Sequence, residues 1–116
     1  MQKVTIWHNP RCSKSRETLA LLQQRDIAAT VVEYLKTPPE TQEIERALEL
    51  LGMAARGLMR DNEAAYTQAH AGDPQLTREQ LVGLMHSHPE LIQRPVVFAN
   101  GKARIGRPPE AVLEIL

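Results

Sequence analysis

The stretch KVTIWHNPRC, residues 3–12, contains the features that determine the fold class. Its first half, residues 3–7, alternates apolar with polar residues and is rich in β-branched ones, which predicts a strand. Asn9-Pro10 then interrupts the chain, and the apolar spacing that follows predicts a helix from Ser13 or Lys14 to about Gln24. We therefore expect Cys12 in the loop between this strand and this helix.

A second strand is predicted over residues 29–34, where β-branched residues return. A helical crossover separates it from the first strand, so the two should pair in parallel as a right-handed βαβ unit. Near the other end of the chain, residues 96–99 read as a buried strand. Asn100-Gly101 is typical of a two-residue hairpin turn, residues 102–105 form its antiparallel partner, and a short helix runs from Pro108 to the C-terminus.

The middle of the chain is predicted to be helical. Apolar residues from Ile44 to Leu51 have helical spacing, and Gly52 is placed to end that helix. Residues 54–72 look helical but are weakly patterned, and Thr77 with a glutamine three residues later forms a capping box before a further helix. The predicted fold class is thus α/β, a βαβ-ββα mixed sheet with a helical insertion between its halves. At 116 residues we expect one domain, 1–116.

Composition excludes several classes of function. Lys plus Arg and Asp plus Glu are equal at 14 each, so no global field attracts nucleic acid or a membrane surface, and any anion site must be local. Aromatic residues are only 3%, too few for base-stacking platforms. No apolar run approaches the ~20 residues that span a bilayer, and the first residues are not a signal segment, so we expect a cytoplasmic protein with no nucleic-acid or membrane partner.

The chain has one cysteine, so it forms no internal disulfide and no cysteine-based metal cluster. His70, His86 and His88 lack metal-ligand spacing, and we expect surface positions for them and no bound metal. A lone cysteine is usually a small buried hydrophobe. At Cys12, however, a helix N-terminus and three cationic neighbours favour a reactive thiolate: Arg11, Lys14 and Arg16.

Two polar residues flank the thiol. His8 lies four residues before it at the strand end, where an imidazolium would favour the thiolate, although a histidine in a loop often has no special role. Ser15 is placed either to hydrogen-bond the sulfur or to cap a backbone N–H in the first helical turn. Both are candidate thiolate-stabilising residues.

The string HNPRCSKSR, residues 8–16, resembles the active-site loop of the glutaredoxin-linked arsenate reductase family. That resemblance covers essentially the whole chain and implies a thioredoxin-like fold. It implies that Cys12 is the catalytic nucleophile, and that the family's three oxyanion-binding arginines correspond to Arg60, Arg94 and Arg107. Arginine suits that task because its planar guanidinium offers paired donors to a tetrahedral oxyanion. Pro95 is the resemblance-based candidate for a cis-proline beside the redox loop.

The resemblance also implies the reaction and its partners. Arsenate would be reduced to arsenite through a Cys12 adduct, as in arsenic detoxification, by an oxidoreductase with no bound cofactor. Because the chain supplies one thiol, glutathione is implied as co-substrate and glutaredoxin as partner. Residues Ser13-Lys14 replace the smaller residues usual in efficient members, and the chain ends sooner after Arg107 than longer members do, so it resembles a short branch of the family.

Three other classes of function can be compared with the sequence. A phosphatase-like Cys-x5-Arg loop is excluded, since the sixth residue after Cys12 is Thr18. A monothiol redox protein that forms mixed disulfides with glutathione is compatible with Cys-x-x-Ser but does not need three arginines. A redox-sensing transcriptional regulator of the same fold would typically carry Cys-x-x-Cys, whereas Ser15 occupies the second position here.

Overall fold

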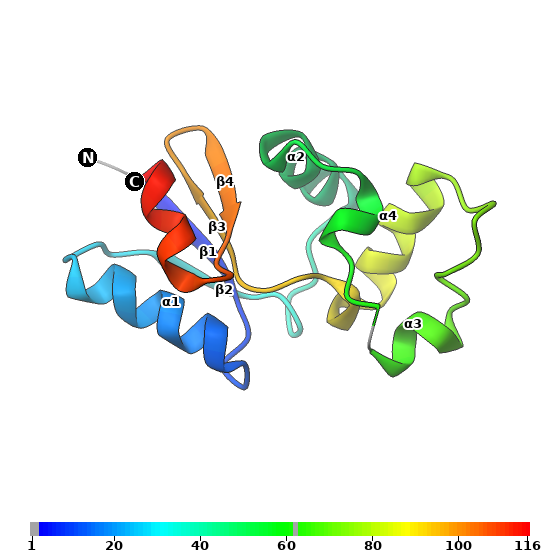
Figure 1. The fold of residues 1–116 in the computed structure, drawn as a ribbon, viewed down its shortest axis with the longest axis horizontal. Coiled ribbons are helices and arrows are strands. Elements are labelled where there is room, and N and C mark those ends of the chain that lie inside the picture. Colours follow the sequence, from blue (N-terminus) through cyan, green and yellow to red (C-terminus); the bar gives the residue numbers. More distant parts are fainter. Residues whose placement is uncertain (1–2, 62) are drawn as a thin grey trace. The chain divides into compact units, whose positions relative to one another are not determined.

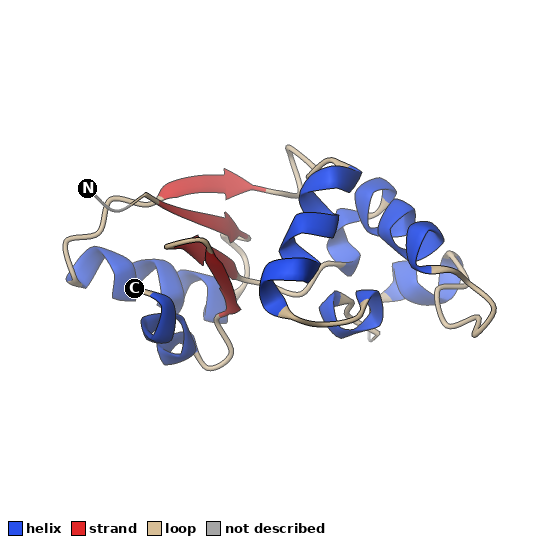
Figure 2. Cartoon of the chain, turned by 90° about the horizontal axis from the view of Figure 1, so that it is seen from above, coloured by secondary structure: helices blue, strands red, loops and turns tan. Residues whose placement is uncertain are grey.

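The computed structural model describes residues 3–61 and 63–116, and within them the chain divides into two compact units. One unit contains the described residues up to Thr37 together with Arg94–Leu116, and it holds the β-sheet. The other unit, Pro38–Gln93, is built from helices. Figure 1 labels the elements, and Figure 2 separates the strands from the helices by colour. The segment that the sequence analysis treated as an insertion is thus the second unit.

The sheet has four strands in the order β2-β1-β3-β4. Strands β1 and β2 are parallel, whereas β1 with β3 and β3 with β4 are antiparallel, so the mixed βαβ-ββα sheet predicted from the sequence is confirmed. Ile6 stands opposite Val31 on one side and Val97 on the other. The elements of this unit are β1 Val4–His8, α1 Ser13–Gln24, β2 Thr30–Glu33, β3 Val96–Ala99, β4 Lys102–Ile105 and the 3-10 helix η3 Pro109–Ile115.

One face of the sheet carries the core of this unit. Alternation along β1 puts Val4 and Ile6 on this face, where they pack with buried residues of α1 and η3. Each fully buried aliphatic side chain stabilises the fold by about 1.5–3 kcal/mol, so this cluster fixes α1 against β1. Since the start of α1 follows the end of β1, the same packing fixes the loop that carries Cys12. The cluster consists of Val4, Ile6, Leu22, Val97, Ala99, Val112 and Ile115.

The β3–β4 hairpin turns at Asn100 and Gly101, which have φ of 54° and 70°. Two successive residues with positive φ are what a two-residue hairpin turn of the right twist requires, and Asn-Gly is the sequence that meets this requirement best. The Asn100 side chain also donates to the carbonyl oxygen of Ile115 at 2.8 Å. This contact ties the C-terminal η3 to the hairpin.

The helical unit begins with α2, Thr41–Leu51, which ends at Gly52 in the left-handed conformation with φ 66°. The predicted stop at Gly52 is confirmed, since a residue without Cβ reaches this conformation at no steric cost. Helix α4, Arg78–Ser87, starts at the predicted capping box: Thr77 Oγ1 accepts from Gln80 N at 3.2 Å, and Thr77 N donates to Gln80 Oε1 at 2.9 Å. The 3-10 helix η2, Pro89–Leu91, follows it.

The prediction of a helix over residues 54–72 was wrong for most of that stretch. The described part contains only the 3-10 helix η1, Ala55–Leu58, and the short helix α3, Ala64–Gln68. The guanidinium of Arg56 donates to the backbone carbonyl oxygens of Ala71 and Asp73, both at 2.6 Å. The Arg56 side chain therefore satisfies two carbonyl groups at the end of this irregular stretch.

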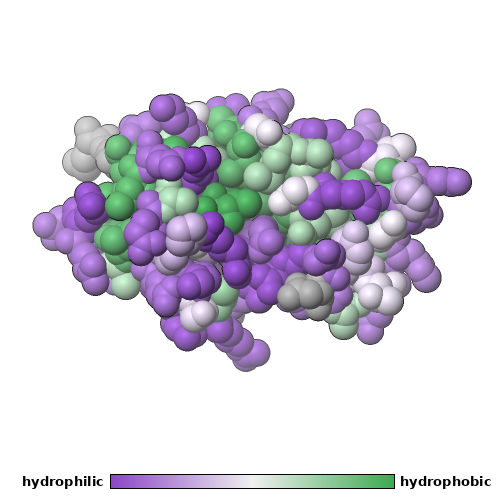
Figure 3. All heavy atoms as spheres, viewed as in Figure 1, coloured by the Kyte–Doolittle hydropathy of each residue, from purple (hydrophilic) through white to green (hydrophobic). Residues whose placement is uncertain are grey.

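The face of the molecule in Figure 3 is covered largely by hydrophilic residues, with hydrophobic residues in patches between them. Among the residues described, no helix has the length and apolar character needed to cross a membrane.

Candidate active site

The loop after β1 turns sharply so that Cys12 is the N-cap of α1. The Cys12 N–H donates to the carbonyl oxygen of Asn9 at 3.0 Å, and the Asn9 side chain accepts from Arg11 N at 3.0 Å. The Cys12 carbonyl then accepts the first helical bond, from Arg16 N at 3.0 Å, while Cys12 itself keeps an extended backbone. The side chain therefore lies where the unpaired N–H groups of the helix start concentrate positive potential.

The Cys12 thiol is partly exposed, and its pKa lies below the ordinary value. Burial favours the neutral thiol, but it is outweighed by the backbone N–H of Ser15, by the Arg94 guanidinium and by the backbone N–H of Lys14. The helix start and an arginine thus favour the thiolate, which is the nucleophilic form of cysteine.

Arg94 and Arg107 come to this sulfur from separate segments. Arg107 Nη2 lies 3.7 Å from Cys12 Sγ, and Arg107 Nε donates to the carbonyl oxygen of Arg94 at 2.8 Å. Burial opposes the charge of Arg94, but hydrogen bonding to Cys12 and to Tyr34 outweighs it and raises the pKa of Arg94. Two guanidinium groups thus lie beside a sulfur that favours the thiolate, which is an arrangement suited to an oxyanion.

His8 contacts the hydroxyl of Ser15. Ser15 Oγ lies 2.6 Å from His8 Nδ1 and accepts from Asn9 N at 3.0 Å. Only 6% of His8 is exposed. Burial lowers the pKa of His8, Glu33 opposes that shift and Arg16 adds to it. The imidazolium expected from the sequence is therefore disfavoured at neutral pH, because the ring is desolvated beside a cation.

The hydroxyl of Ser15 is engaged away from the thiol. When His8 Nδ1 carries no proton, the hydroxyl donates to it while accepting from Asn9. The contribution of Ser15 to the thiolate comes from its backbone N–H. One sequence-based expectation for Ser15 was that its hydroxyl would cap a backbone N–H in the first helical turn. The N–H that it accepts from belongs instead to Asn9, in the loop before α1.

Two proline junctions border the site. The Arg94–Pro95 peptide bond is cis, and so is Arg107–Pro108, which the sequence analysis did not anticipate. Between the two junctions, the Gly106 N–H donates to the Pro95 carbonyl oxygen at 2.9 Å. This bond holds the segment before Arg107 against the segment after Arg94.

Arg60 lies in the helical unit, whereas the other predicted site residues lie in the sheet unit. Its Nε lies 3.2 Å from Glu63 Oε1, and its Nη1 donates to Gln93 Oε1 at 3.3 Å. The side chain is only 14% exposed, and the backbone N–H donates to the Leu91 carbonyl oxygen at 2.7 Å. Arg60 thus contacts Glu63 within the 54–72 stretch and Gln93, the last residue of the helical unit.

The three other histidines do not form a site. His70 is exposed, and His88 lies 3.6 Å from Glu90 Oε1. His86 is partly buried, with Nδ1 2.8 Å from the carbonyl oxygen of Pro39, so the expectation of a plain surface position was wrong for this residue. No group of three or more His, Cys, Asp or Glu residues within 3–61 and 63–116 is placed to hold a metal ion.

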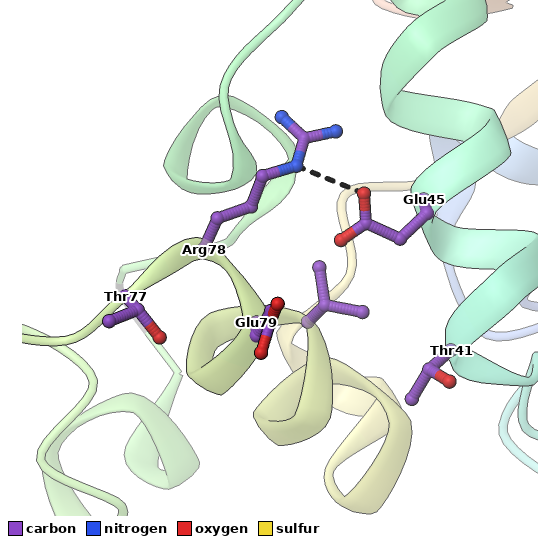
Figure 4. Close-up of a pocket in the computed structure, with 6 residues that line it drawn as sticks. Thr41, Glu45, Thr77, Arg78 and Glu79 are labelled. Atoms are coloured by element: carbon purple, nitrogen blue, oxygen red, sulfur yellow. Dashed lines mark hydrogen bonds and ion pairs between the residues drawn. The ribbon is translucent and has the colours of Figure 1, made fainter.

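A hollow of about 750 Å³ lies in the helical unit between α2 and α4 (Figure 4). Arg78 reaches from α4 and donates through Nε to Glu45 Oε2 on α2 at 3.0 Å. The Glu79 carboxylate adds a second negative charge to the lining. Because the guanidinium there is already paired with a carboxylate, this hollow is less suited to an oxyanion than the loop at Cys12.

Sequence reasoning missed two residues of the site. Tyr34 is fully buried at the end of β2 and hydrogen-bonds Arg94. Gly106 packs directly against α1 and Pro95. Their contacts depend on tertiary packing between segments far apart in the sequence.

A cysteine of lowered pKa at the N-cap of the first helix, a cis-proline directly before β3 and a four-stranded mixed sheet together define a thioredoxin-like protein. Arg94 and Arg107 beside the thiol, which suit an oxyanion, indicate a narrower group within the thioredoxin-like proteins. A family model described as the ArsC family matches residues 7–115, and the chain belongs to that family.

Relatives over the full length agree with this assignment. An arsenate reductase of Neisseria meningitidis serogroup B is 46% identical over 117 residues, with 100% of both chains covered. Uncharacterized protein YfgD of Escherichia coli K12 is 51% identical, covering 99% of this chain and 98% of that one. Among solved structures, an arsenate reductase from Vibrio cholerae superposes with a TM-score of 0.97 at 51% identity, covering 99% of this chain and 98% of that chain.

Proposed function

We propose that the protein reduces arsenate to arsenite with the Cys12 thiolate as nucleophile. The observation that carries this proposal is the meeting of two arginines at a thiol of lowered pKa: Arg107 Nη2 lies 3.7 Å from Sγ, and Arg94 hydrogen-bonds the same sulfur. A thiolate alone suits many redox reactions. A thiolate between two guanidinium groups suits attack on a tetrahedral oxyanion. The relatives named arsenate reductases identify arsenate as the oxyanion to test first.

In the first step, the Cys12 sulfur forms a bond to arsenic(V), and one arsenate hydroxyl group takes up a proton from solvent and leaves as water as its arsenic–oxygen bond breaks. Arg94 and Arg107 hold the remaining oxygens and offset the negative charge that develops on them. Arg60, which lies in the helical unit, is proposed as a third ligand of the oxyanion, as the resemblance implies.

The second step needs a thiol from outside, because Cys12 is the sole cysteine of the sequence. Glutathione attacks the Cys12 sulfur, a disulfide forms, and the sulfur–arsenic bond breaks with its electron pair moving to arsenic. Two thiols are oxidised to one disulfide while arsenic(V) becomes arsenic(III), so the electrons balance. Glutaredoxin then reduces the mixed disulfide on Cys12, and the cycle belongs in the cytoplasm, where glutathione is kept reduced.

The test is arsenate-dependent oxidation of NADPH in the presence of glutathione, glutaredoxin and glutathione reductase. Wild-type protein should turn over, Cys12→Ser should not, and omission of glutaredoxin should stop the cycle after a single turnover. An NADPH rate that does not depend on arsenate, or one that survives Cys12→Ser, contradicts the proposal.

Intact mass provides a separate test of the external-thiol step. Oxidised glutathione should add one glutathione at Cys12, and none to Cys12→Ser. If the adduct forms and glutaredoxin removes it while arsenate stays unreduced, the protein is the monothiol redox protein that the Cys-x-x-Ser sequence also allows. If no adduct forms under conditions that modify a small monothiol control, the external-thiol cycle is wrong.

A further inference from the structure

Gly106 occupies a space in which no side chain fits. A Cβ built at this position would lie 2.5 Å from Thr18 Oγ1, 2.8 Å from Pro95 Cγ and 3.2 Å from Thr18 Cγ2. Its backbone is outside the left-handed region, so the requirement for glycine comes from space and not from conformation. Two of the three contacts are made by the side chain of Thr18.

Thr18 cannot move aside easily. It is fully buried on α1, and its Oγ1 donates to the carbonyl oxygen of Lys14 at 2.8 Å. On the opposite side, the Gly106 N–H is bonded to the Pro95 carbonyl oxygen at 2.9 Å. Gly106 is therefore enclosed between α1, the helix that follows Cys12, and the segment that begins at Arg94.

The residue after Gly106 is Arg107, whose position depends on this enclosure. Arg107 Nε donates to the Arg94 carbonyl oxygen at 2.8 Å, and its Nη2 lies 3.7 Å from Cys12 Sγ. Relieving a contact of 2.5 Å at Gly106 requires a backbone shift of roughly 1 Å, and a misplacement of that size costs an enzyme about 100-fold in rate.

We propose that Gly106 and Thr18 are positioning residues that set the Arg107 guanidinium beside the Cys12 sulfur. The role in catalysis rests on the proposed arsenate reduction, whereas the effect on the thiol does not. The Thr18 side chain limits the space beside Gly106, and the absence of a Cβ lets the Gly106 backbone approach it closely. This close packing places the Arg107 guanidinium beside the sulfur. Neither positioning residue needs to touch the oxyanion.

The experiment compares Gly106→Ala, Thr18→Ala and the double variant with wild type. Gly83→Ala is the matched control, because a Cβ at Gly83 on α4 meets nothing within 4 Å. Three quantities are measured on each protein: the pH at which iodoacetamide alkylation of Cys12 is half-maximal, and kcat and KM for arsenate. Thermal unfolding verifies that each variant is folded.

Gly106→Ala should move the alkylation midpoint to higher pH and lower kcat/KM for arsenate about 10- to 100-fold, while Gly83→Ala matches wild type. The double variant should recover part of both losses, because removing the Thr18 side chain removes two of the three close contacts. A general loss of packing would lower the melting temperature without moving the alkylation midpoint, so the pH profile separates positioning from stability.

A folded Gly106→Ala protein with wild-type midpoint and kcat/KM overturns the proposal. If Gly106→Ala does not fold, Thr18→Ala decides: it should broaden the placement of Arg107 and raise the midpoint by a smaller amount, and an unchanged midpoint overturns the proposal. If wild type fails to reduce arsenate, the proposed function fails while the alkylation midpoints still test the positioning.

Discussion

The side chain of Arg107 is anchored on the backbone of Arg94: Arg107 Nε donates to the Arg94 carbonyl oxygen at 2.8 Å. The Arg94 side chain separately hydrogen-bonds Cys12. Arg94 thus contributes its guanidinium to the sulfur and its carbonyl to the second arginine. Because a carbonyl is unaffected by side-chain substitution, the two contributions can be separated experimentally.

Arg94→Lys should retain the anchor of Arg107 and lose the planar guanidinium. A lysine keeps the charge but cannot reproduce the paired donors that serve Cys12 and Tyr34, so the pKa of Cys12 should rise and kcat/KM for arsenate should fall about tenfold or more. Steady-state kinetics and the alkylation midpoint measure the two effects. Arg104→Lys is the control, since Arg104 on β4 is exposed and pairs with Glu114.

The direction of the Cys12 pKa predicts how its reactivity depends on pH. Iodoacetamide should alkylate the folded protein at a rate that levels off below the pKa of ~8.5 of a free thiol. A rate that still rises through pH 8 to 9 indicates an ordinary thiol. A thiol that reacts only after unfolding indicates a structural one.

The same shift has a consequence for stability. A thiol whose pKa is lower in the folded state stabilises the fold above its unfolded pKa, and this stabilisation is lost as the pH falls through the folded pKa. The free energy of unfolding of wild type minus that of Cys12→Ser should therefore increase from the folded pKa up to about 8.5. Urea titrations across this range measure it, and a difference that is flat or decreasing contradicts the assignment.

The parts of the fold that were predictable are those specified by local chemistry. Asn100-Gly101 demands positive φ twice, and this fixed both the turn and the bounds of β3 and β4. Thr77 and Gln80 satisfy each other's backbone N–H groups, which fixed the start of α4. Residues 54–72 have no such local signal, and the carbonyl groups of Ala71 and Asp73 at the end of this stretch are bonded by the distant side chain of Arg56.

The candidate site also has a part that the local sequence predicts and a part that depends on tertiary packing. That Cys12 sits at a helix start followed from the strand, the Asn9-Pro10 break and the helical spacing after it. That Arg107 is held by the Arg94 carbonyl did not follow, because the bond joins two loops through the packing of Gly106. The neutral state of His8 depends on its burial, and alternation along a five-residue strand does not reveal how deeply its last residue is buried.

Ser15→Ala should destabilise the fold more than it changes the thiol. The substitution removes the acceptor of the Asn9 N–H and the partner of His8, both buried, and a buried polar group left without its partner costs about 1–3 kcal/mol. The Ser15 backbone N–H remains beside the sulfur, so the alkylation midpoint should move less than in Arg94→Lys. Ser13→Ala, at an exposed position of α1, is the control. Unfolding in urea measures the stability of both, and equal losses contradict a structural role for the Ser15 hydroxyl.

Glu63→Gln tests whether Arg60 binds the oxyanion. In the structure the Glu63 carboxylate lies 3.2 Å from Arg60 Nε, with the two side chains 29% and 14% exposed, so a bound oxyanion would have to share this guanidinium with a carboxylate. A glutamine oxygen can still accept the hydrogen bond but carries no charge. If Arg60 is a ligand, KM for arsenate should fall about two- to fivefold, the effect of removing an ion pair of about 0.5–1 kcal/mol, with kcat little changed.

The matched control is Glu45→Gln, which neutralises the partner of Arg78 in the same unit and should leave KM unchanged. Arg60→Lys gives the opposite test: it should raise KM, since lysine lacks the planar donors. The alternative is that Arg60 only connects its segment to Gln93, to which Nη1 donates at 3.3 Å. In that case both Arg60→Lys and Glu63→Gln should lower the melting temperature and leave KM at the wild-type value. The oxyanion would then be held by Arg94 and Arg107 without Arg60.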